Sequence, residues 1–360
     1  MSSLNVVVWG TGNVGRPALR AVAAHRDLTL AGVVVSDPDK VGKDAGELCG
    51  LDPLGVIATD DTQVAFADDV DCVVYAATAD TRIEEATGEL LMLLGAGRNV
   101  VSTSFYPLLH PAMVHPVLEP LVNDVTLSGN SSVFISGIDP GWVMDALPLF
   151  LSGVCADITE IRAQEVFNYA FYDQPQIVRE VCGFGTSMDE TPPMLLDVAL
   201  LTVWAPMLRV LADGLEVELS ETTTQVERRP LEATVEVDGM GTFEAGTQGA
   251  FRFEVQGWVG DHKLLVIEHI TRIHDDCAPE WDPSPHHGGV HRVKIAGRPN
   301  LEVTVHGNET GEPAAAGGGN ATAANRIVNA IPAVVAAPAG VVHPFDLPVI
   351  SGKSQVRVGR

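Results

Sequence analysis

Apolar positions in the first 140 residues form short continuous runs, separated by stretches that carry apolar residues at helical spacing. The runs are typical of strands buried on both faces, and they cover residues 5–9, 28–35, 71–77 and 99–102. Residues 17–24 and 84–95, which lie between runs, have the spacing of helices. Because strands and helices alternate, we predict βαβ units around a parallel sheet, and hence a Rossmann-type domain over residues 1–140.

The pattern changes after residue 140, where longer and partly alternating strands follow one another with few helices. These strands are expected at residues 158–167, 234–237, 250–258, 263–271 and 301–306, with one helix at 192–212. The pattern predicts a second, α+β domain over residues 141–320 with an open, largely antiparallel sheet, of the kind used for substrate binding or dimerisation. The glycine-rich segment 311–320 predicts a flexible connector. We expect the C-terminal segment 321–345, which resumes a helical pattern, to pack back on the first domain.

A glycine-rich loop follows the first strand at once and opens a predicted helix. It consists of Gly10, Thr11, Gly12, Asn13, Val14 and Gly15. The GxGxxG spacing between an apolar strand and a helix is typical of a dinucleotide-binding turn, in which the glycines permit a tight bend, a close approach of the pyrophosphate, and helix–strand packing. The helix N-terminus offers N–H groups to the diphosphate. We therefore predict that the loop binds NAD(P); a glycine-rich turn without a ligand is the alternative.

The choice between the two nicotinamide cofactors depends on the end of the second strand. Asp37 stands where an acidic residue would bind the ribose 2′-hydroxyl of NAD(H). Arg16, Ser36 and Lys40, however, together form a plausible cradle for a 2′-phosphate. We predict NADP(H), with NAD(H) as the alternative, in which case Arg16 and Lys40 are solvated surface charges.

Small polar residues follow the third and fourth strands. Ligands of open α/β sheets bind at the carboxyl ends of strands, so we expect Ala77, Thr78 and Thr103 to border the cofactor. Asn325, in the C-terminal helical segment, is a further cofactor candidate. Ordinary loop positions are the alternative for each.

Composition and charge narrow the class of protein. Of the 360 residues, 46% are hydrophobic and 19% charged, which is ordinary for a globular protein, and the formal net charge of −25 disfavours binding to nucleic acid or an anionic membrane. No uninterrupted apolar run is long enough for a membrane span, and the N-terminus shows no signal-peptide pattern. Five widely spaced cysteines fit reduced thiols, so we expect a cytoplasmic protein.

Three stretches of the chain resemble one family of oxidoreductases. They are VVVWGTGNVGRPAL at 6–19, SGIDPGW at 136–142 with Met144 and Asp145 following, and NRIVNAIPAVVAAPAG at 325–340. They resemble the 2,4-diaminopentanoate dehydrogenase family, which is related to dihydrodipicolinate reductase in its N-terminal domain and includes native amine dehydrogenases. The resemblance implies reversible hydride transfer between NAD(P)H and an imine carbon, with ammonia and a ketone or aldehyde on one side and an amine on the other. It also implies a homodimer formed through the sheet of the second domain.

The sequence departs from that family at one position. By this resemblance, members that aminate carbonyls carry a glutamate just after the strand at 99–102, where this chain has Ser104, Phe105, Tyr106 and Pro107. Tyr106 and His110 lie where that glutamate would be and are candidates to replace it, with packing roles as the alternative. Two rival hypotheses therefore stay open: a carbonyl reductase that uses Tyr106 or His269 as its acid without ammonia, and a nucleotide-binding homologue without catalytic activity.

The second half of the chain offers its own candidate residues. Glu165 closes a predicted strand and shares one face with Phe167 and Tyr169, so that an apolar setting would raise its pKa and let it handle a proton. A salt-bridged or solvent-facing glutamate is the alternative. His269 interrupts an apolar strand and is a candidate proton donor or substrate anchor in the cleft expected between the domains, with a core histidine as the alternative.

Further residues are predicted to bind a small and fairly apolar substrate. Asn168 and Tyr172 could donate hydrogen bonds to a polar substrate group, or serve in loop packing. The predicted apolar and aromatic lining consists of Phe134, Trp142, Phe167 and Tyr169. The stretch between His274 and His291 is rich in His, Asp and Glu but matches no compact zinc motif, so we expect no metal.

Overall fold

The protein is described by a computed structural model that covers residues 3–79, 82–110, 118–172, 174–286, 288–309 and 314–356. The chain forms two compact units. Unit 1 comprises Met1–Ile138 and Asn320–Arg360, and unit 2 comprises Asp139–Gly319.

Unit 1 is built on a seven-stranded sheet in the order β15-β6-β5-β4-β1-β2-β3, in which every pair of neighbours is parallel. The strands are β1 (Leu4–Trp9), β2 (Leu28–Val34), β3 (Ala58–Thr59), β4 (Cys72–Tyr75), β5 (Asn99–Ser102), β6 (Ser132–Ile135) and β15 (Gly340–Val341). The helices are α1 (Gly15–Ala24), α2 (Ala45–Cys49), α3 (Ile83–Gly95), α4 (Leu118–Gly129) and α7 (Ala314–Val335), with short helices η1 (Pro38–Lys40), η2 (Thr62–Phe66) and η3 (Tyr106–Leu109). The predicted Rossmann-type parallel sheet is confirmed.

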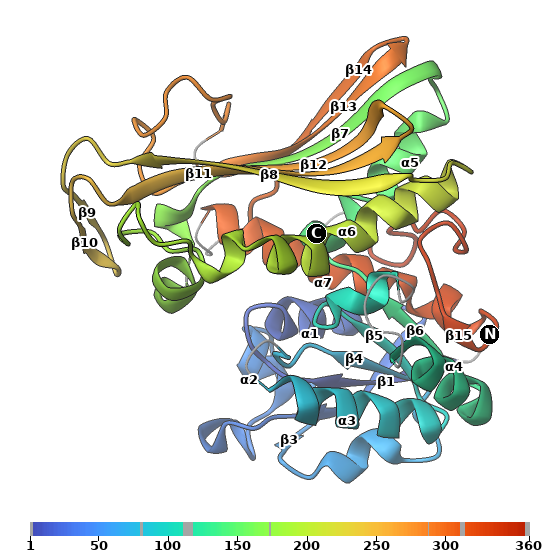
Figure 1. The fold of residues 1–360 in the computed structure, drawn as a ribbon. Coiled ribbons are helices and arrows are strands. Elements are labelled where there is room, and N and C mark those ends of the chain that lie inside the picture. The colour runs from blue at the N-terminus through green and yellow to red at the C-terminus, as the bar shows by residue number, and fades with distance from the viewer. Residues whose placement is uncertain are drawn as a thin grey trace. The chain divides into compact units, whose positions relative to one another are not determined.

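The central strands of unit 1 are apolar because both faces of the sheet are covered. Val6 and Val8 pack with residues of α1 and α7, which lie on one face. Val7, between them, points to the opposite face and is also fully buried. Helices α3 and α4 lie on that opposite face (Figure 1). This two-sided cover explains why continuous apolar runs in the sequence predicted these strands correctly.

Unit 2 contains a six-stranded sheet in the order β14-β13-β7-β12-β11-β8. Its strands are β7 (Ala156–Asn168), β8 (Glu221–Pro230), β11 (Gln248–Val259), β12 (His262–Arg272), β13 (Gly289–Arg298) and β14 (Leu301–Val305). Strands β7 and β12 pair in parallel and the other neighbours are antiparallel, so the predicted, largely antiparallel sheet is confirmed. A separate hairpin joins β9 (Val235–Val237) to β10 (Gly241–Phe243). The helices are α5 (Ala146–Ser152) and α6 (Asp197–Gly214), with short helices η6 (Tyr169–Phe171), η7 (Ile177–Val181) and η8 (Pro193–Leu195). The segment η5 (Ile138–Trp142) is an irregular turn, because its residues 139–141 have non-helical backbone angles.

The two faces of the six-stranded sheet differ in chemistry. On the face that carries α5 and α6 (Figure 1), side chains from neighbouring strands form aromatic contacts with Trp204 of α6. The opposite face carries no helix in the described part of unit 2. There Arg162 bridges the buried carboxylates of Glu254 and Glu268, both at 2.7 Å. Successive side chains of a strand alternate between the two faces, so the aromatic contacts lie on one face and the ion pairs on the other. Glu268 and the adjacent His269 point to opposite faces in this way.

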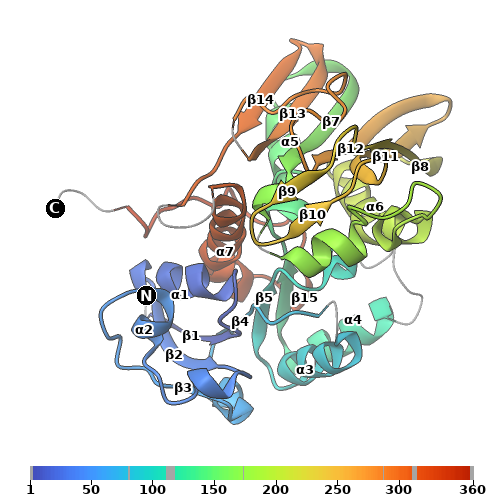
Figure 2. The same ribbon diagram turned by 90° about the vertical axis from the view of Figure 1, so that its left-hand side faces the viewer.

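The sequence prediction of a flexible connector at 311–320 is wrong for the residues that the structure describes. Helix α7 begins at Ala314 and runs without interruption to Val335 (Figure 2). Alanine favours the helix, and Gly318 lets this helix approach the backbone of Gly307, where a side chain would overlap. Residues 311–313 lie outside the described residues. Among those described, no helix combines the length and the apolar character needed to cross a bilayer.

Candidate active site

The glycine-rich loop of unit 1 leaves the N-terminus of α1 open to a ligand. Gly10 adopts a φ of +98° and its α-carbon lies against the backbone of Ala76 and Ala77. Around Gly12, in contrast, no atom lies within 4 Å of the position a β-carbon would take. Helix α1 has neither a side-chain cap nor an acidic residue in its first turn. These features fit the pyrophosphate of a dinucleotide, because the N–H groups and the helix dipole face an open position.

A hollow of about 360 Å³ adjoins this loop. Its lining consists of Thr11, Gly12, Asn13, Arg16, Lys40, Lys43, Glu47 and Leu48. Lys40 Nζ lies 3.4 Å from the carbonyl oxygen of Thr11 and 3.9 Å from a carboxylate oxygen of Asp37. Asp37 also accepts a hydrogen bond from the amide of Asp39, so that its carboxylate caps η1. The hollow is therefore lined by three cations and by one carboxylate, that of Glu47, which lies 3.7 Å from Lys43 Nζ.

Hydroxyl groups hold the carboxyl ends of β4 and β5 together. Ser102 Oγ donates to the carbonyl of Tyr75, and Ser104 Oγ donates to that of Ala77, both at 2.7 Å. Ser102 Oγ also accepts from the amide of Ser104 at 3.0 Å. Thr103 lies between the two serines, and η3 with Tyr106 follows directly.

In unit 2 the strand register places three titratable side chains in one row. Glu165 of β7 is paired with His269 of β12 on one side and with His291 of β13 on the other. Paired residues of neighbouring strands share a face, so these side chains meet. Glu165 Oε1 lies 3.4 Å from His269 Nδ1, and Glu165 Oε2 lies 3.3 Å from His291 Nε2. All three side chains are buried.

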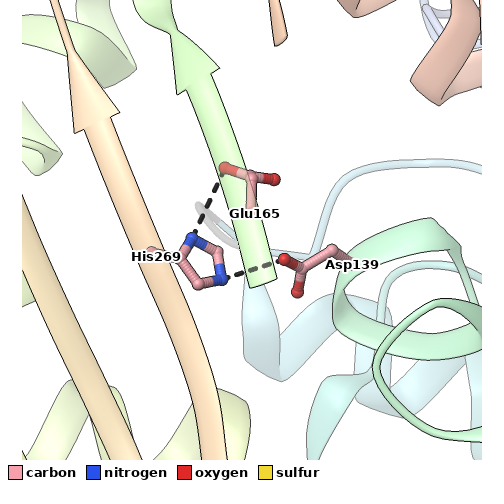
Figure 3. A group of neighbouring side chains, drawn as sticks. All are labelled: Asp139, Glu165 and His269. Carbon is pink, nitrogen blue, oxygen red and sulfur yellow. Dashed lines mark ion pairs between the residues drawn. The ribbon is translucent and has the colours of Figure 1, made fainter. Parts of the chain in front are cut away.

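Asp139 completes this group from a different element. Its Oδ2 lies 2.9 Å from His269 Nε2, so that His269 has a carboxylate at each ring nitrogen (Figure 3). The carboxylate of Asp139 also accepts a hydrogen bond from Trp204 Nε1 of α6, at 3.1 Å. The amide of the neighbouring Gly141 points at the sulfur of Met207, one turn further along α6. Helix α6 therefore positions Asp139 against the strand that carries His269.

The charges of this group set its pKa values. Burial alone would lower the pKa of His269, but the carboxylates of Asp139 and Glu165 outweigh it and raise that pKa to about 10. Burial alone would raise the pKa of Glu165, but His269 and His291 hold it well below its usual value. The raised pKa expected for Glu165 is therefore wrong, because Glu165 has imidazole partners. Burial and the nearby Glu165 carboxylate raise the pKa of Tyr169.

Aromatic rings surround the acid–histidine group. His269 stacks on Phe253 with a centroid distance of 4.5 Å and meets the edge of Trp204 at 4.9 Å. His291 lies 4.9 Å from the ring of Phe167. Tyr169 donates a hydrogen bond to Glu165 Oε1 at 3.0 Å. The site thus combines buried charge with an apolar wall.

Asp139, Glu165 and His269 also bring three atoms of the metal-ligand type within 4.8 Å of one another. The two carboxylates, however, lie at different nitrogens of one imidazole ring. Each carboxylate is paired with its own ring nitrogen, at 2.9 Å for Asp139 and 3.4 Å for Glu165. We therefore interpret the group as an ion-paired proton site.

Comparisons with known proteins agree with both units. The 2,4-diaminopentanoate dehydrogenase C-terminal domain family matches residues 142–357, and the N-terminal domain family of dihydrodipicolinate reductase matches residues 4–92. An amine dehydrogenase of Streptomyces virginiae is 48% identical over 348 residues, which are 96% of this chain and 96% of that protein. The chain belongs to the 2,4-diaminopentanoate dehydrogenase family.

More distant relatives extend the match over the whole chain. The 2,4-diaminopentanoate dehydrogenase of Acetoanaerobium sticklandii is 23% identical, with 97% of this chain and 94% of that protein covered. The structure of the amine dehydrogenase from Mycobacterium smegmatis shares the fold with a TM-score of 0.75 at 21% identity, over 99% of each chain. The family resemblance predicted from the sequence is confirmed. This member of the 2,4-diaminopentanoate dehydrogenase family is an NAD(P)-dependent oxidoreductase of the amine dehydrogenase type.

The cofactor residues predicted for this family member lie in the glycine loop, after strands β2, β4 and β5 of unit 1, and on α7. Thr11, Gly12, Asn13, Arg16 and Lys40 line one hollow. The remaining predicted positions are Gly10, Val14 and Gly15 in the loop, exposed Ser36 after β2, Ala77 and Thr78 after β4, Thr103 after β5, and exposed Asn325 on α7.

The substrate residues predicted from the sequence fall into different environments. Glu165, Phe167 and Tyr169 share the buried face of unit 2, and Trp142 is half-buried at the end of η5. Tyr172 stacks on Tyr169 with a centroid distance of 5.0 Å. The last two predicted residues make other contacts. Asn168 caps η6 and donates a hydrogen bond to Asp275 at 2.7 Å. Phe134 is fully buried in the core of unit 1, where Arg326 lies over its ring.

Sequence reasoning missed two residues of the acid–histidine group. Asp139 stands in the IDPGW stretch, which carried the family resemblance but was given no chemical role. His291 stands in a histidine-rich stretch that was not predicted as a strand. A strand prediction for residues 289–298 alone would not have put His291 beside Glu165, because β13 pairs with β7 and not with β12, the strand that precedes it in the sequence.

Proposed function

We propose that the chain catalyses the reversible, NADP(H)-dependent interconversion of an amine with ammonia and a small ketone or aldehyde. The observation that carries the proposal is the buried group of Asp139, His269 and Glu165 in unit 2. A histidine held between two carboxylates among aromatic rings is suited to exchange a proton in a site from which water is excluded. Membership of an amine dehydrogenase family supports C–N chemistry as the purpose of that proton transfer.

His269 would supply the proton that lets water leave during amination. In the amination direction ammonia adds to the carbonyl carbon and forms a carbinolamine. The carbinolamine hydroxyl takes a proton from His269 Nε2 and leaves as water, so that a C–O bond breaks and a C=N bond forms. When bound, NADPH would supply the hydride that reduces the resulting iminium carbon. The imidazole then regains a proton from solvent, and the net reaction converts carbonyl, ammonia, NADPH and one proton to amine, NADP⁺ and water.

The preference for NADP(H) over NAD(H) is also proposed. Arg16, Lys40 and Lys43 line the hollow beside the glycine loop, and a 2′-phosphate would bring two further negative charges to them. Asp37, which would bind a ribose hydroxyl in an NAD(H) enzyme, is engaged with Lys40 and with the amide of Asp39. Lys40→Ala should raise KM for NADPH about tenfold or more and leave KM for NADH nearly unchanged. Equal increases in KM for NADPH and KM for NADH would contradict the preference for NADP(H).

We propose a homodimer as the working state of the enzyme. The helix-free face of the six-stranded sheet in unit 2 carries the buried ion pairs of Arg162 with Glu254 and Glu268, and it offers a broad surface for a second copy. Light scattering coupled to gel filtration tests this: a mass twice the 38.1 kDa of one chain is expected. A monomer at working concentration would contradict it.

The decisive experiment is NADPH oxidation with cyclohexanone or a short aldehyde, with and without ammonium at alkaline pH. The proposal predicts oxidation that requires ammonium. Turnover with the carbonyl alone would instead identify a carbonyl reductase, with Tyr106 or His269 as its acid. Tight NADPH binding without oxidation across a broad panel of carbonyls and imines would identify a homologue that has lost its chemistry.

A further inference from the structure

Glu165 is enclosed by proton donors from three separate elements. His269 Nδ1 of β12 lies 3.4 Å from Oε1, and Tyr169 OH of η6 donates to the same oxygen at 3.0 Å. His291 Nε2 of β13 lies 3.3 Å from Oε2 as an ion-pair contact, without an aligned hydrogen bond to a residue that the structure describes. Only 11% of the Glu165 side chain is exposed. Both of its oxygens are therefore directed at protein groups, which leaves this carboxylate poorly placed to take a proton from a substrate.

Both ring nitrogens of His269 face a carboxylate. Nδ1 faces Glu165. Nε2 lies 2.9 Å from Asp139 Oδ2, yet neither of these two buried atoms makes an aligned hydrogen bond with any residue that the structure describes. The ring itself is fixed between Phe253 and Trp204. A small polar atom that approached Nε2 would find a donor that lacks a well-aligned acceptor.

We propose that Glu165 is a positioning residue, fixed by His291 and Tyr169, which orients His269 so that Nε2 alone exchanges a proton with the substrate. The inference rests on the proposed function, and it assigns a separate role to each residue of the site. Asp139 and Glu165 bias the charge of the ring, His269 transfers the proton, and His291 and Tyr169 hold Glu165 in place.

Of the described side chains packed against the His269 ring, only those of Asp139 and Glu165 carry charge. Asp139 and Glu165 contact the ring directly, and Trp204 and Phe253 contribute no charge. Glu165 in turn faces His291, Tyr169 and, at longer range, Cys182, whose pKa burial and Glu165 raise to about 12. Since Cys182 is uncharged at neutral pH, the two carboxylates dominate the electrostatic environment of His269. Removing either one should lower the pKa of its imidazole.

The experiment follows the His269 imidazole by ¹⁵N NMR in the full chain, with the signal assigned by its absence in His269→Gln. In the wild type, His269 is expected to stay doubly protonated through pH 8. Glu165→Gln and Asp139→Asn should each lower its pKa by about one to three pH units. Glu180→Gln, an exposed glutamate of η7, is the matched control and should cause no change. A wild-type His269 that titrates near pH 6.5, or a Glu165→Gln protein with an unchanged His269, overturns the inference.

A second readout separates positioning from direct proton transfer by Glu165. If Glu165 only orients His269, Glu165→Gln should retain kcat to within about tenfold once the pH is adjusted to the new pKa. If Glu165 itself exchanged the substrate proton, kcat should fall by about 10²–10⁴ at every pH, and that outcome overturns the inference. Tyr169→Phe removes one neutral donor and should lower kcat about two- to tenfold without moving the pKa of His269. The NMR titration needs no substrate, so it stays informative even if the proposed reaction is wrong.

Discussion

Gly12 and Gly15 stand three residues apart in the nucleotide loop, and their surroundings differ. A β-carbon on Gly15 would overlap the carbonyl group of Gly10, whereas a β-carbon on Gly12 would meet no atom of the protein. Gly15 is therefore needed for the packing of α1 on β1. Gly12 is needed only if a ligand approaches the backbone at that point.

This difference gives a test of the loop. Gly15→Ala should destabilise unit 1 and lower Tm. Gly12→Ala should fold with an unchanged Tm but bind NADPH about tenfold or more weakly. Gly88→Ala, on α3 where space is also open, is the control and should stabilise the fold by about 1 kcal/mol without any effect on NADPH affinity. Calorimetric titration measures NADPH affinity and thermal unfolding measures Tm. A Gly12→Ala protein with wild-type affinity for NADPH would show that the cofactor does not bind at this loop.

The raised pKa of His269 predicts how the reaction rate depends on pH. Amine oxidation needs a neutral imidazole to accept a proton, and amination needs an imidazolium to donate one. Because the pKa of His269 is raised to about 10, kcat for oxidation should rise with pH up to about 10, while kcat for amination should be level below that pH and fall above it. Rates at saturating substrate separate this effect from the titration of ammonia. An oxidation profile that levels off near pH 6.5 would contradict the assignment.

Helix α6 packs in the core of unit 2 and also contacts the candidate active site. Trp204 donates to Asp139 from this helix, and Met207 lies against the amide of Gly141. A shift of α6 would therefore move Asp139 relative to His269. The helix acts as a support for the site as well as a layer of the fold.

Two matched tryptophans test this support. Trp204→Phe keeps the ring contacts but removes the hydrogen bond to Asp139, and it should lower kcat severalfold while it costs about 1 kcal/mol of stability. Trp258→Phe removes an equivalent bond to Thr223 at the edge of the sheet and should cost similar stability with no effect on kcat. Steady-state kinetics and urea unfolding give both values. Equal effects of the two substitutions on kcat would argue against a role for α6 in positioning.

The ion-pair network on the opposite face of the sheet predicts how stability depends on pH. Burial alone would raise the pKa of Glu254, but Arg162 and its other partners lower it to about 2. A carboxylate whose pKa is depressed in the folded state contributes stability that is fully present above about pH 4.5 and is lost as the pH falls toward 2. Arg162→Met should lower the free energy of unfolding at pH 7 by about 3 kcal/mol and flatten the acid limb. Arg298→Met, which breaks an exposed pair with Asp157, is the control and should change stability by less than about 1 kcal/mol. An unchanged acid limb in Arg162→Met would show that Arg162 does not set the pKa of Glu254.

Across the whole molecule, the local pattern of apolar residues predicted both sheets but not the complete acid–histidine group. Continuous apolar runs identify β1, β2, β4 and β5 because both faces of that sheet are covered. Strand β8 was missed because its residues are half-exposed or exposed throughout, and such a strand has no apolar pattern to detect. Glu165 and His269 were each chosen as candidates, but their contact depends on a strand register that joins residues about a hundred positions apart, which no local signal encodes.

The proposed reaction joins the nitrogen of ammonia to the carbonyl carbon and reduces the resulting C=N bond with a hydride from NADPH. The most direct test supplies cyclohexanone, ¹⁵N-labelled ammonium and NADPH, and follows the product by mass spectrometry together with NADPH oxidation. We expect cyclohexylamine that carries one ¹⁵N atom for each NADPH oxidised, and loss of both signals in His269→Gln. Cyclohexanol without ¹⁵N, formed at the same rate with or without ammonium, would contradict it.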